Sequence, residues 1–303
     1  MRVQNRIRTT GIITFLAMMI PGIGFGATGD ETVARGNYIF RVAGCIGCHT
    51  TEADRKKNTF LAGGRALKTP FGTYYSPNIT PDPKFGIGNW REHDFVRALR
   101  QGKNPDGRHY FPVFPYTSYT QMTDQDMRDL WAFLKTQPPV PRKNKDHDVG
   151  ILFGARIIIG AWKILNFSPG VVAQDSAKSG NWNRGRYLVN ALGHCGECHT
   201  PRDHLGGTKT EMYLSGTSNG PDGDTVPNIT PDKETGINTW TNDDYDSLLS
   251  MGMLPDGDFV GGSMGEVVDN LEKLTEADRN AIVVYLKSIP AIFHKIEKSP
   301  AKQ

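Results

Sequence analysis

The sequence predicts an all-α protein made of two tandem domains, which arose by internal duplication and are joined by an apolar connector helix. Three observations support this. Two Cys-x-x-Cys-His motifs lie 150 residues apart, the same offset recurs around them, and each half has helical patterns before its motif and at its end. At 303 residues the chain can form two modest cores. Strand alternation is not evident.

The first 27 residues resemble an export signal. Three arginines precede an apolar run at 11–20, and the stretch 24–27 offers a cleavage site. Because the run is shorter than the roughly 20 residues that span a bilayer, we expect a cleaved signal rather than an anchor. Both alternatives place the remaining chain outside the cytoplasm.

The net charge gives no reason to expect a nucleic-acid partner. The formal charge is +3, and the first 27 residues contain three arginines and no acidic residue. The mature chain is therefore close to neutral, and we expect it not to bind nucleic acid.

The two motifs are Cys45-Ile46-Gly47-Cys48-His49 and Cys195-Gly196-Glu197-Cys198-His199, and they contain all four cysteines. Two thiols one helical turn apart can add to the two vinyl groups of a porphyrin, and the next residue then lies under the iron as proximal ligand. We predict two covalently bound haem c groups. Their attachment and proximal residues are Cys45, Cys48, His49, Cys195, Cys198 and His199.

Other uses of Cys-x-x-Cys pairs explain the pattern less well. Zinc sites usually place the two pairs about 15–20 residues apart. A thioredoxin-type dithiol lies near a βαβ pattern, which this sequence lacks. Local disulfides give no reason for a histidine after both pairs.

The repeat extends over both halves. Residues 78–82 match 228–232, both reading Asn-Ile-Thr-Pro-Asp, and the terminal helices begin at Thr123 and Thr275 as N-caps. Each half therefore contains the helices of a small class I-like cytochrome c domain. The predicted divisions are a signal at 1–27, domain 1 at 28–137, a linker with the connector at 138–180, domain 2 at 181–290 and a tail at 291–303.

Four polar residues of the repeat have two possible roles. Asn78, Thr80, Asn228 and Thr230 either donate hydrogen bonds to haem propionates or cap turns. The residue types favour neither role.

The sixth ligands differ between the halves. Met264 lies in a predicted flexible loop before Thr275 and is our candidate for the second haem. The corresponding part of the first half has no methionine, so we choose Met122 there, with His109 as the competing candidate. Met127 falls on the apolar face of a helix and is expected in the core. The other loop histidines, His93, His147, His194 and His204, are expected to be solvated.

The connector is unusually apolar. Residues 151–167 are apolar on nearly all faces except at Arg156 and Lys163, and they are a poor transmembrane helix. Either the segment packs between the domains, or it lies in the membrane interface or against a partner subunit with Trp162 as an anchor. We favour docking, and we expect association with the membrane surface.

With these motifs placed, the sequence resembles the cytochrome c subunits of bacterial membrane-bound alcohol, gluconate and aldehyde dehydrogenases, and the cytochrome partners of periplasmic molybdenum hydroxylases. The resemblance covers nearly the whole mature chain. It rests on residues 44–50, 77–82, 114–119, 182–188 and 193–202.

This resemblance implies an electron carrier without catalytic activity, located in the periplasm on the outer face of the inner membrane. Such a subunit takes electrons from a catalytic dehydrogenase subunit and passes them, haem to haem, to a quinone or an oxidase. It also implies Met264 and Met122 as distal ligands. Many family members carry a third haem domain, whereas this sequence stops at Gln303, which leaves the electron exit open.

Two other hypotheses belong to different classes. A diheme redox enzyme, peroxidase-like or thiosulfate-oxidising, needs one haem with an exchangeable distal position, and Met122 separates it from the carrier. A soluble shuttle meets its partners only transiently.

Overall fold

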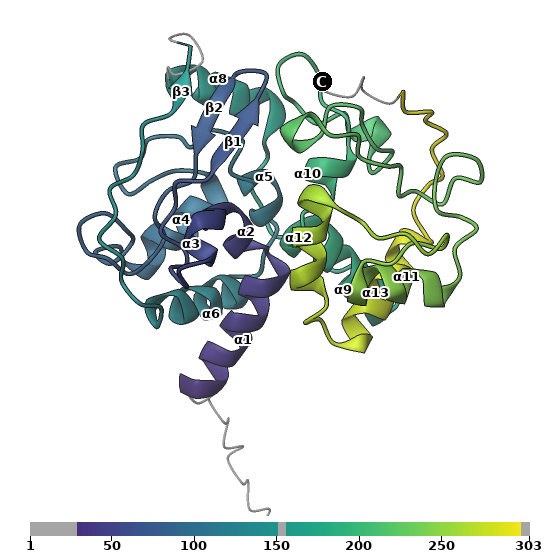
Figure 1. Cartoon of the computed structure of the whole chain (residues 1–303), viewed down its shortest axis with the longest axis horizontal. Helices are drawn as coiled ribbons and strands as arrows, with labels where there is room; N and C mark the ends of the chain where they lie inside the picture. The colour runs from purple at the N-terminus through teal and green to yellow at the C-terminus, as the bar shows by residue number, and fades with distance from the viewer. Residues whose placement is uncertain (1–28, 151–155, 298–303) are drawn as a thin grey trace, which may run out of the picture.

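The computed structural model describes residues 29–150 and 156–297. The expected signal at 1–27, the start of the connector at 151–155 and the chain end at 298–303 lie outside the described residues. In Figure 1 the chain forms two lobes side by side, one coloured purple to teal and the other green to yellow. Both lobes are mostly helices and loops, as the predicted fold class requires.

The first lobe is built on two crossing helices. Its helices are α1 (Gly29–Val42), α2 (Cys45–His49), α3 (Glu52–Arg55), α4 (Glu92–Gln101), α5 (Tyr116–Tyr119) and α6 (Asp124–Lys135). Where α1 meets α6, a Cβ on Gly36 would lie 2.0 Å from the carbonyl oxygen of Asp129. Only glycine therefore permits this approach. The neighbouring Arg35 donates from Nε to the Asp129 carboxylate at 2.7 Å.

A small antiparallel sheet departs from the all-α prediction. Strands β1 (Ala66–Thr69), β2 (Gly72–Tyr75) and β3 (Asp148–Val149) pair in that order. Gly72 has a φ of +126°, and a Cβ there would lie 2.5 Å from the carbonyl oxygen of Asp148. The strands are too short to show a clear alternation, which is why the sequence did not predict them.

The second lobe repeats the helix crossing. Its helices are α9 (Gly180–Tyr187), α10 (Gly196–His199), α11 (Asn242–Met251), α12 (Gly262–Leu271) and α13 (Glu276–Leu286), with a π-helical turn η1 (Leu188–Leu192) and 3-10 turns η2 (Thr210–Met212) and η3 (Pro221–Gly223). A Cβ on Gly185 would lie 1.9 Å from the carbonyl oxygen of Ala281 on α13. The predicted caps are confirmed, since Thr123 and Thr275 each accept a hydrogen bond from the amide three residues on.

The π-helical turn explains a one-residue difference between the lobes. Cys195 lies one residue further from Gly185 than Cys45 lies from Gly36. A π-turn accommodates an extra residue without ending the helix, and η1 lies in this interval. Both motifs can therefore follow the same helix crossing.

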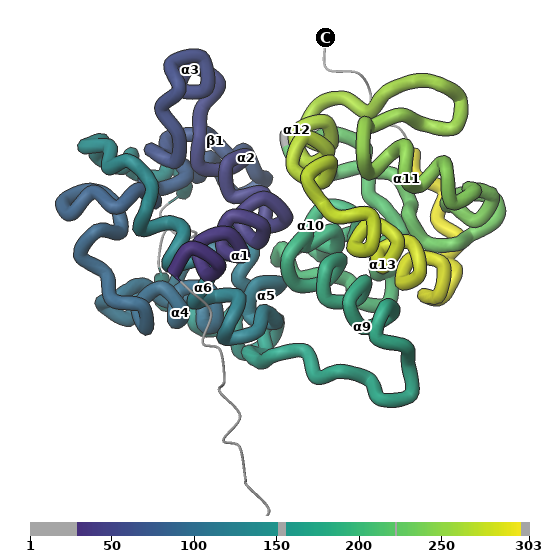
Figure 2. Tube along the Cα trace, turned by 90° about the horizontal axis from the view of Figure 1, so that it is seen from below, coloured from purple at the N-terminus to yellow at the C-terminus, as the bar shows by residue number. Residues whose placement is uncertain are grey.

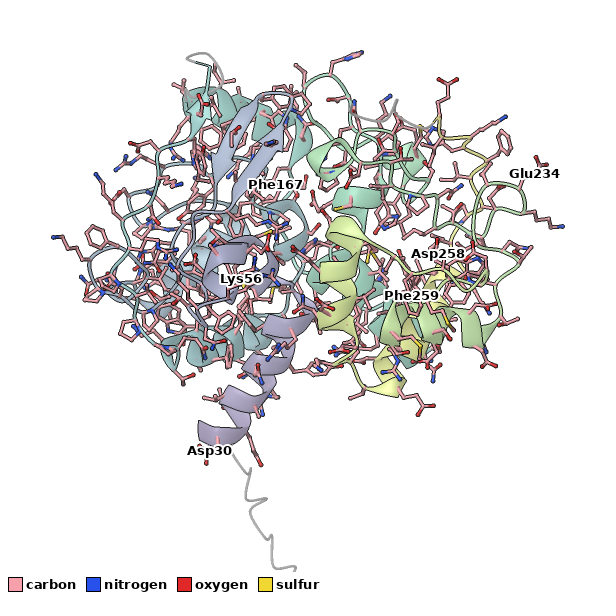
Figure 3. The ribbon with its side chains drawn as sticks, in the orientation of Figure 1. Asp30, Lys56, Phe167, Glu234, Asp258 and Phe259 are labelled. Atoms are coloured by element: carbon pink, nitrogen blue, oxygen red, sulfur yellow. The ribbon has the colours of Figure 1, made fainter. Side chains whose placement is uncertain are left out.

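The described part of the connector forms helix α8 (Arg156–Asn166), which contacts both lobes. On the first lobe, Ile159 packs into the cluster beneath the sheet, and Lys163 donates to two carbonyls at the end of α4, each at 2.7 Å. On the second lobe, Trp162 Nε1 donates to the carbonyl of Leu205 at 2.9 Å. Figure 3 shows Phe167, just after α8, near the middle of the molecule. Among the described residues, none of the helices has the length and apolar character needed to cross a bilayer.

Candidate haem sites

Both Cys-x-x-Cys-His motifs form a single helical turn. The first is α2 and the second spans Cys195 and α10. A left-handed residue precedes each turn, Gly44 with a φ of 60° and His194 with a φ of 39°. The turn projects the two thiols of each motif from one side, as attachment to one porphyrin edge requires.

The histidine of each motif is oriented by the same contact. His49 Nδ1 lies 2.7 Å from the carbonyl oxygen of Pro77, and His199 Nδ1 lies 2.9 Å from that of Pro227. Each proline is 28 residues after its histidine. A carbonyl at Nδ1 holds the proton there and leaves Nε2 as a lone-pair donor for a metal. Burial lowers the pKa of both imidazoles, which favours the neutral, ligating form.

A second matched pair fixes the backbone beside each histidine. The buried Thr50 and Thr200 each accept a hydrogen bond at 3.0 Å, from the amides of Leu61 and Leu214. These partners are 11 and 14 residues away, yet both leucines adopt left-handed conformations, with φ of 64° and 62°. The two halves thus reach the same local structure with loops of different length.

The repeated asparagines and threonines serve the turns. Asn78 Oδ1 accepts from the amide and hydroxyl of Thr80 at 2.9 and 2.7 Å, and Asn228 Oδ1 accepts from Thr230 at 2.9 and 2.8 Å. Each threonine hydroxyl also accepts from an amide after the terminal helix, that of Val140 or Ile292. These bonds support the turn-capping role of the two left open by the sequence.

Met122 lies in the interior of the first lobe. Its side chain is 0% exposed, just before the cap of α6, within the main apolar cluster against which Cys45 and Ile46 pack. Met127 is also 0% exposed, on the inner side of α6, as expected for a core residue. Met122 remains the predicted sixth ligand of the first haem.

Met264 lies in a helix rather than in the predicted flexible loop. It occupies the first turn of α12 and is half-buried. Met264, Val268 and Leu271 recur at helical spacing, which gives this segment one apolar face. Glycines at 261, 262 and 265 suggested a loop, and packing against the first lobe overrides their low helix propensity. Met264 as sixth ligand remains a prediction.

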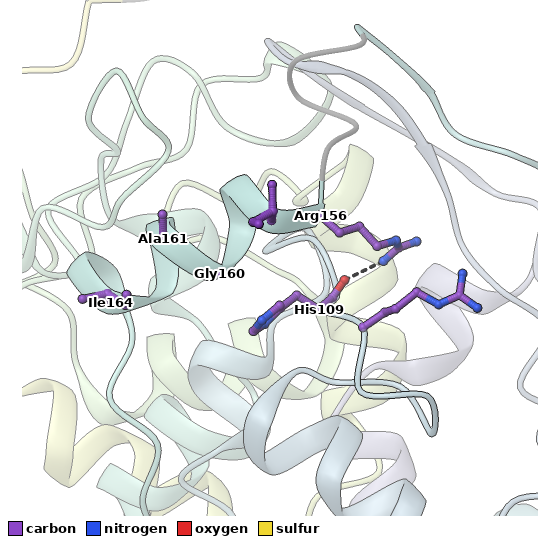
Figure 4. Close-up of a pocket in the computed structure, with 7 residues that line it drawn as sticks. His109, Arg156, Gly160, Ala161 and Ile164 are labelled. Carbon is purple, nitrogen blue, oxygen red and sulfur yellow. Dashed lines mark hydrogen bonds between the residues drawn. The ribbon is translucent and has the colours of Figure 1, made fainter.

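His109 packs under α8. A Cβ on Gly160 would lie 3.3 Å from His109 Nε2, and Arg156 donates to the His109 carbonyl at 2.5 Å (Figure 4). Burial lowers the pKa of His109, and Lys163 and Lys103 lower it further. Its ring thus packs against the connector helix, and the choice between Met122 and His109 as sixth ligand stays a prediction.

Two other histidines depart from the expected solvated state. His194 is half-buried and its ring lies 5.4 Å from that of Tyr119 on α5. His147 packs edge-on against Tyr74 and Phe111. Aromatic partners that are distant in sequence bury both histidine rings. The residues next to each histidine in the chain gave no sign of this burial.

The four cysteines fit attachment to haem better than a shared zinc site. All four are free thiols, so neither pair forms a local disulfide. In the part of the chain that the structure describes, no three His, Cys, Asp or Glu side chains cluster to hold a metal ion. Burial raises the pKa of the Cys198 thiol to about 11, with further contributions from Glu197 and from Cys48 of the other motif. The two motifs lie near each other, since Tyr119 donates to the carbonyl of Ala43 just before the first motif and its ring contacts that of His194 just before the second.

Comparison with known proteins shows the family of this chain. A family model for cytochrome c matches residues 33–138. A diheme cytochrome c-type protein of Cereibacter sphaeroides is 46% identical over 274 residues, which cover 90% of each chain. This chain belongs to the cytochrome c family. As a cytochrome c it binds haem covalently, and Cys45, Cys48 and His49 lie in the matched region.

Other relatives are subunits of dehydrogenases. The cytochrome subunit of fructose dehydrogenase of Gluconobacter japonicus is 38% identical over 264 residues, which cover 86% of this chain and 53% of that protein. The cytochrome c subunit of a quinone-dependent alcohol dehydrogenase of Gluconobacter oxydans is 35% identical over 292 residues, covering 91% of this chain and 59% of that protein. This cytochrome c thus spans little more than half the length of these two subunits.

The sequence missed the residues that orient the histidines. Pro77 and Pro227 directly precede the repeated segments 78–82 and 228–232, but their carbonyls were given no role. Their equal spacing from His49 and His199 was the available signal.

Proposed function

We propose that this cytochrome is a diheme electron carrier built from two tandem domains that arose by duplication. It accepts electrons from a catalytic dehydrogenase subunit and passes them from one haem to the other, towards a quinone or an oxidase. The observation that carries the proposal is the matched pair of histidines, each held through Nδ1 by a proline carbonyl 28 residues on. The dehydrogenase subunits among the relatives support the partner.

The residues of the chain hold and insulate each centre. When bound, each haem c supplies a reversible one-electron couple. His49 and His199 would hold the iron through Nε2, and the buried Met122 and the half-buried Met264 would supply the sixth ligands. Thioether ligation on both distal sides would leave no exchangeable position, as a pure carrier requires.

We place the protein in the periplasm, on the outer face of the inner membrane. The positive, apolar and small-residue pattern at 1–27 supports export.

Helix α8 is our candidate for contact with the membrane surface. Ile157, Ile164 and Leu165 are 84%, 85% and 78% exposed, and Arg108 and Arg156 flank them. An apolar face beside cations is typical of helices that lie in the interface of an anionic bilayer. We expect Ile164→Glu with Leu165→Glu to abolish binding to phosphatidylglycerol-containing vesicles. The control Phe259→Glu changes another exposed apolar side chain, labelled in Figure 3, and should bind as the wild type does.

The carrier function is tested with the native complex. Purification from its own host should recover a dehydrogenase subunit, and addition of that enzyme's substrate should reduce both haems. Recovery without a dehydrogenase, or substrate that reduces neither haem, would overturn the proposal.

A further inference from the structure

A tyrosine of the first lobe is bound to the terminal helix of the second. Tyr38 on α1 donates from its hydroxyl to the carboxylate of Asp278 at 2.5 Å, across 240 residues of sequence. The same hydroxyl accepts a hydrogen bond from the amide of Thr275, the cap of α13, at 3.3 Å. The phenol thus forms hydrogen bonds with the acidic side chain and with a backbone amide that has no partner inside helix α13.

The second lobe returns the same contact. Tyr187 on α9 donates to the carboxylate of Asp126 at 2.5 Å and accepts from the amide of Thr123 at 3.1 Å. Asp126 and Thr123 occupy in α6 the positions that Asp278 and Thr275 occupy in α13. The two contacts are therefore related by an approximate two-fold axis between the lobes.

The carboxylate of the first of these contacts is held charged. Burial acts to raise the pKa of Asp278, but the hydrogen bonds from Arg184 and Tyr38 lower it overall. Burial raises the pKa of both tyrosines, so each keeps the proton that it donates. A neutral phenol on a carboxylate is a charge-assisted hydrogen bond.

Polar contacts beside the two motifs also run between the lobes in both directions. Glu266 on α12 of the second lobe accepts from Arg65 at 2.5 Å, and the same arginine donates to the carbonyl of Gly47 inside the first motif. Glu197 inside the second motif accepts from the hydroxyls of Thr117 and Ser118 on α5 of the first lobe, at 2.6 and 2.7 Å. Each motif is thus held by a helix of the opposite lobe.

The segments that lead into the two motifs meet at Tyr119. Its hydroxyl donates to the carbonyl of Ala43 at 2.8 Å, and its ring contacts that of His194. Ala43 lies two residues before Cys45, and His194 directly precedes Cys195. The view in Figure 2, turned from that of Figure 1, also places α2, α1 and α5 of the first lobe on the side that faces α10 and α12. The segments that carry the attachment cysteines therefore lie on the facing sides of the two lobes.

We propose that Tyr38 and Tyr187 are reciprocal positioning residues, which lock the lobes so that an electron passes directly between the haem edges across the Tyr119 contact. Only the electron-transfer consequence rests on the proposed function. One electron leaves the reduced centre and enters the oxidised one, with no bond made or broken. The lock consists of the hydrogen bonds of Tyr38 and Tyr187 and does not depend on that function.

Amide hydrogen exchange tests the lock at single residues. Tyr38→Phe removes the acceptor of the Thr275 amide, and Tyr187→Phe removes that of Thr123. Each amide donates to a neutral phenol oxygen, and loss of a neutral hydrogen bond corresponds to a shift of roughly 2- to 10-fold, so we expect exchange at the affected amide to accelerate by that order. Each single variant should affect only its own amide. Tyr245→Phe is the matched control, since its buried hydroxyl donates within the second lobe, to Ile237 at 3.2 Å, and should change neither amide.

Inter-haem coupling tests the consequence. In the double variant Tyr38→Phe with Tyr187→Phe, we expect slower electron transfer between the haems and weaker magnetic coupling, with the spectrum of each haem unchanged. Exchange or coupling equal to the wild type in the double variant would overturn the proposal. A chain with one haem would instead contradict the diheme function, and the exchange result would stand apart from it.

Discussion

The two lobes treat the two sides of the haem differently. On the proximal side they agree closely: His49 and His199 have the same carbonyl partner at the same spacing, and Gly36 and Gly185 allow the same helix crossing. Among the proposed distal ligands, Met122 directly precedes the cap of α6, whereas Met264 lies in a separate helix further from the cap of α13. Covalent attachment fixes the proximal geometry, while any segment that delivers a thioether serves the distal side.

The largest expected effect comes from the proximal ligands. His49→Ala and His199→Ala should each remove the low-spin signal of one haem, about half of the total, and leave the other intact. Pyridine haemochrome assay and ferric absorption spectra measure this. Loss of both signals in one variant would mean that the two sites do not form independently.

Next come the distal methionines, where the lobes differ. Met122→Ala should remove one of the two methionine-to-iron charge-transfer bands, and Met264→Ala the other. Met127→Ala is the control, because truncating a buried methionine costs about 2–5 kcal/mol in either case. A wild-type protein with a single methionine band, left unchanged in Met122→Ala, would transfer the role to His109.

The helix crossings should respond alike. Gly36→Ala and Gly185→Ala each force a Cβ into a carbonyl oxygen, 2.0 and 1.9 Å away, and should lower the free energy of unfolding by about 3 kcal/mol. Guanidinium titration of the holoprotein measures the change. Gly180→Ala is the control on α9, because nothing lies within 4 Å of its added Cβ. Equal stabilities of all three variants would show that the crossing is looser than described.

The smallest expected effect is a difference between the lobes in how their stability depends on pH. Arg142 donates to Asp54 and, with burial opposing, lowers the pKa of Asp54 from 3.8 to about 2. A carboxyl group whose pKa is lower in the folded state stabilises the fold at a pH above its unfolded-state pKa. This stabilisation is lost as the pH falls from about 4 to 2. We expect the first lobe to lose about 1–2 kcal/mol over this window, and Asp54→Asn to remove that loss.

The described residues of the second lobe form no matching pair, and His204 and His294 follow at the corresponding places. His294 Nδ1 lies 3.0 Å from the carbonyl oxygen of Ser215, whereas in the first lobe Arg142 contacts the carboxylate of Asp54. Hydrogen exchange read separately for α6 and α13 between pH 4 and 2 compares the lobes. Equal acid loss in both would contradict the assignment to Asp54.

The sequence predicted what local chemistry determines. The two motifs, the caps at Thr123 and Thr275 and the apolar face that contains Met127 follow from spacing and side-chain type, and the structure agrees. It failed for Met264, where glycines suggested a loop and tertiary packing formed a helix. It also could not show the pairing of Tyr38 with Asp278, because nothing in either segment specifies a partner 240 residues away.

The central claim is that each lobe carries one six-coordinate haem c. A spectropotentiometric titration of the wild-type protein, with ferric spectra at each end, tests it most directly. The account predicts two one-electron waves, both from low-spin haems with methionine charge-transfer absorption. A single wave, or a high-spin component that binds cyanide, would contradict it, and the second result would point to a diheme enzyme with an exchangeable ligand.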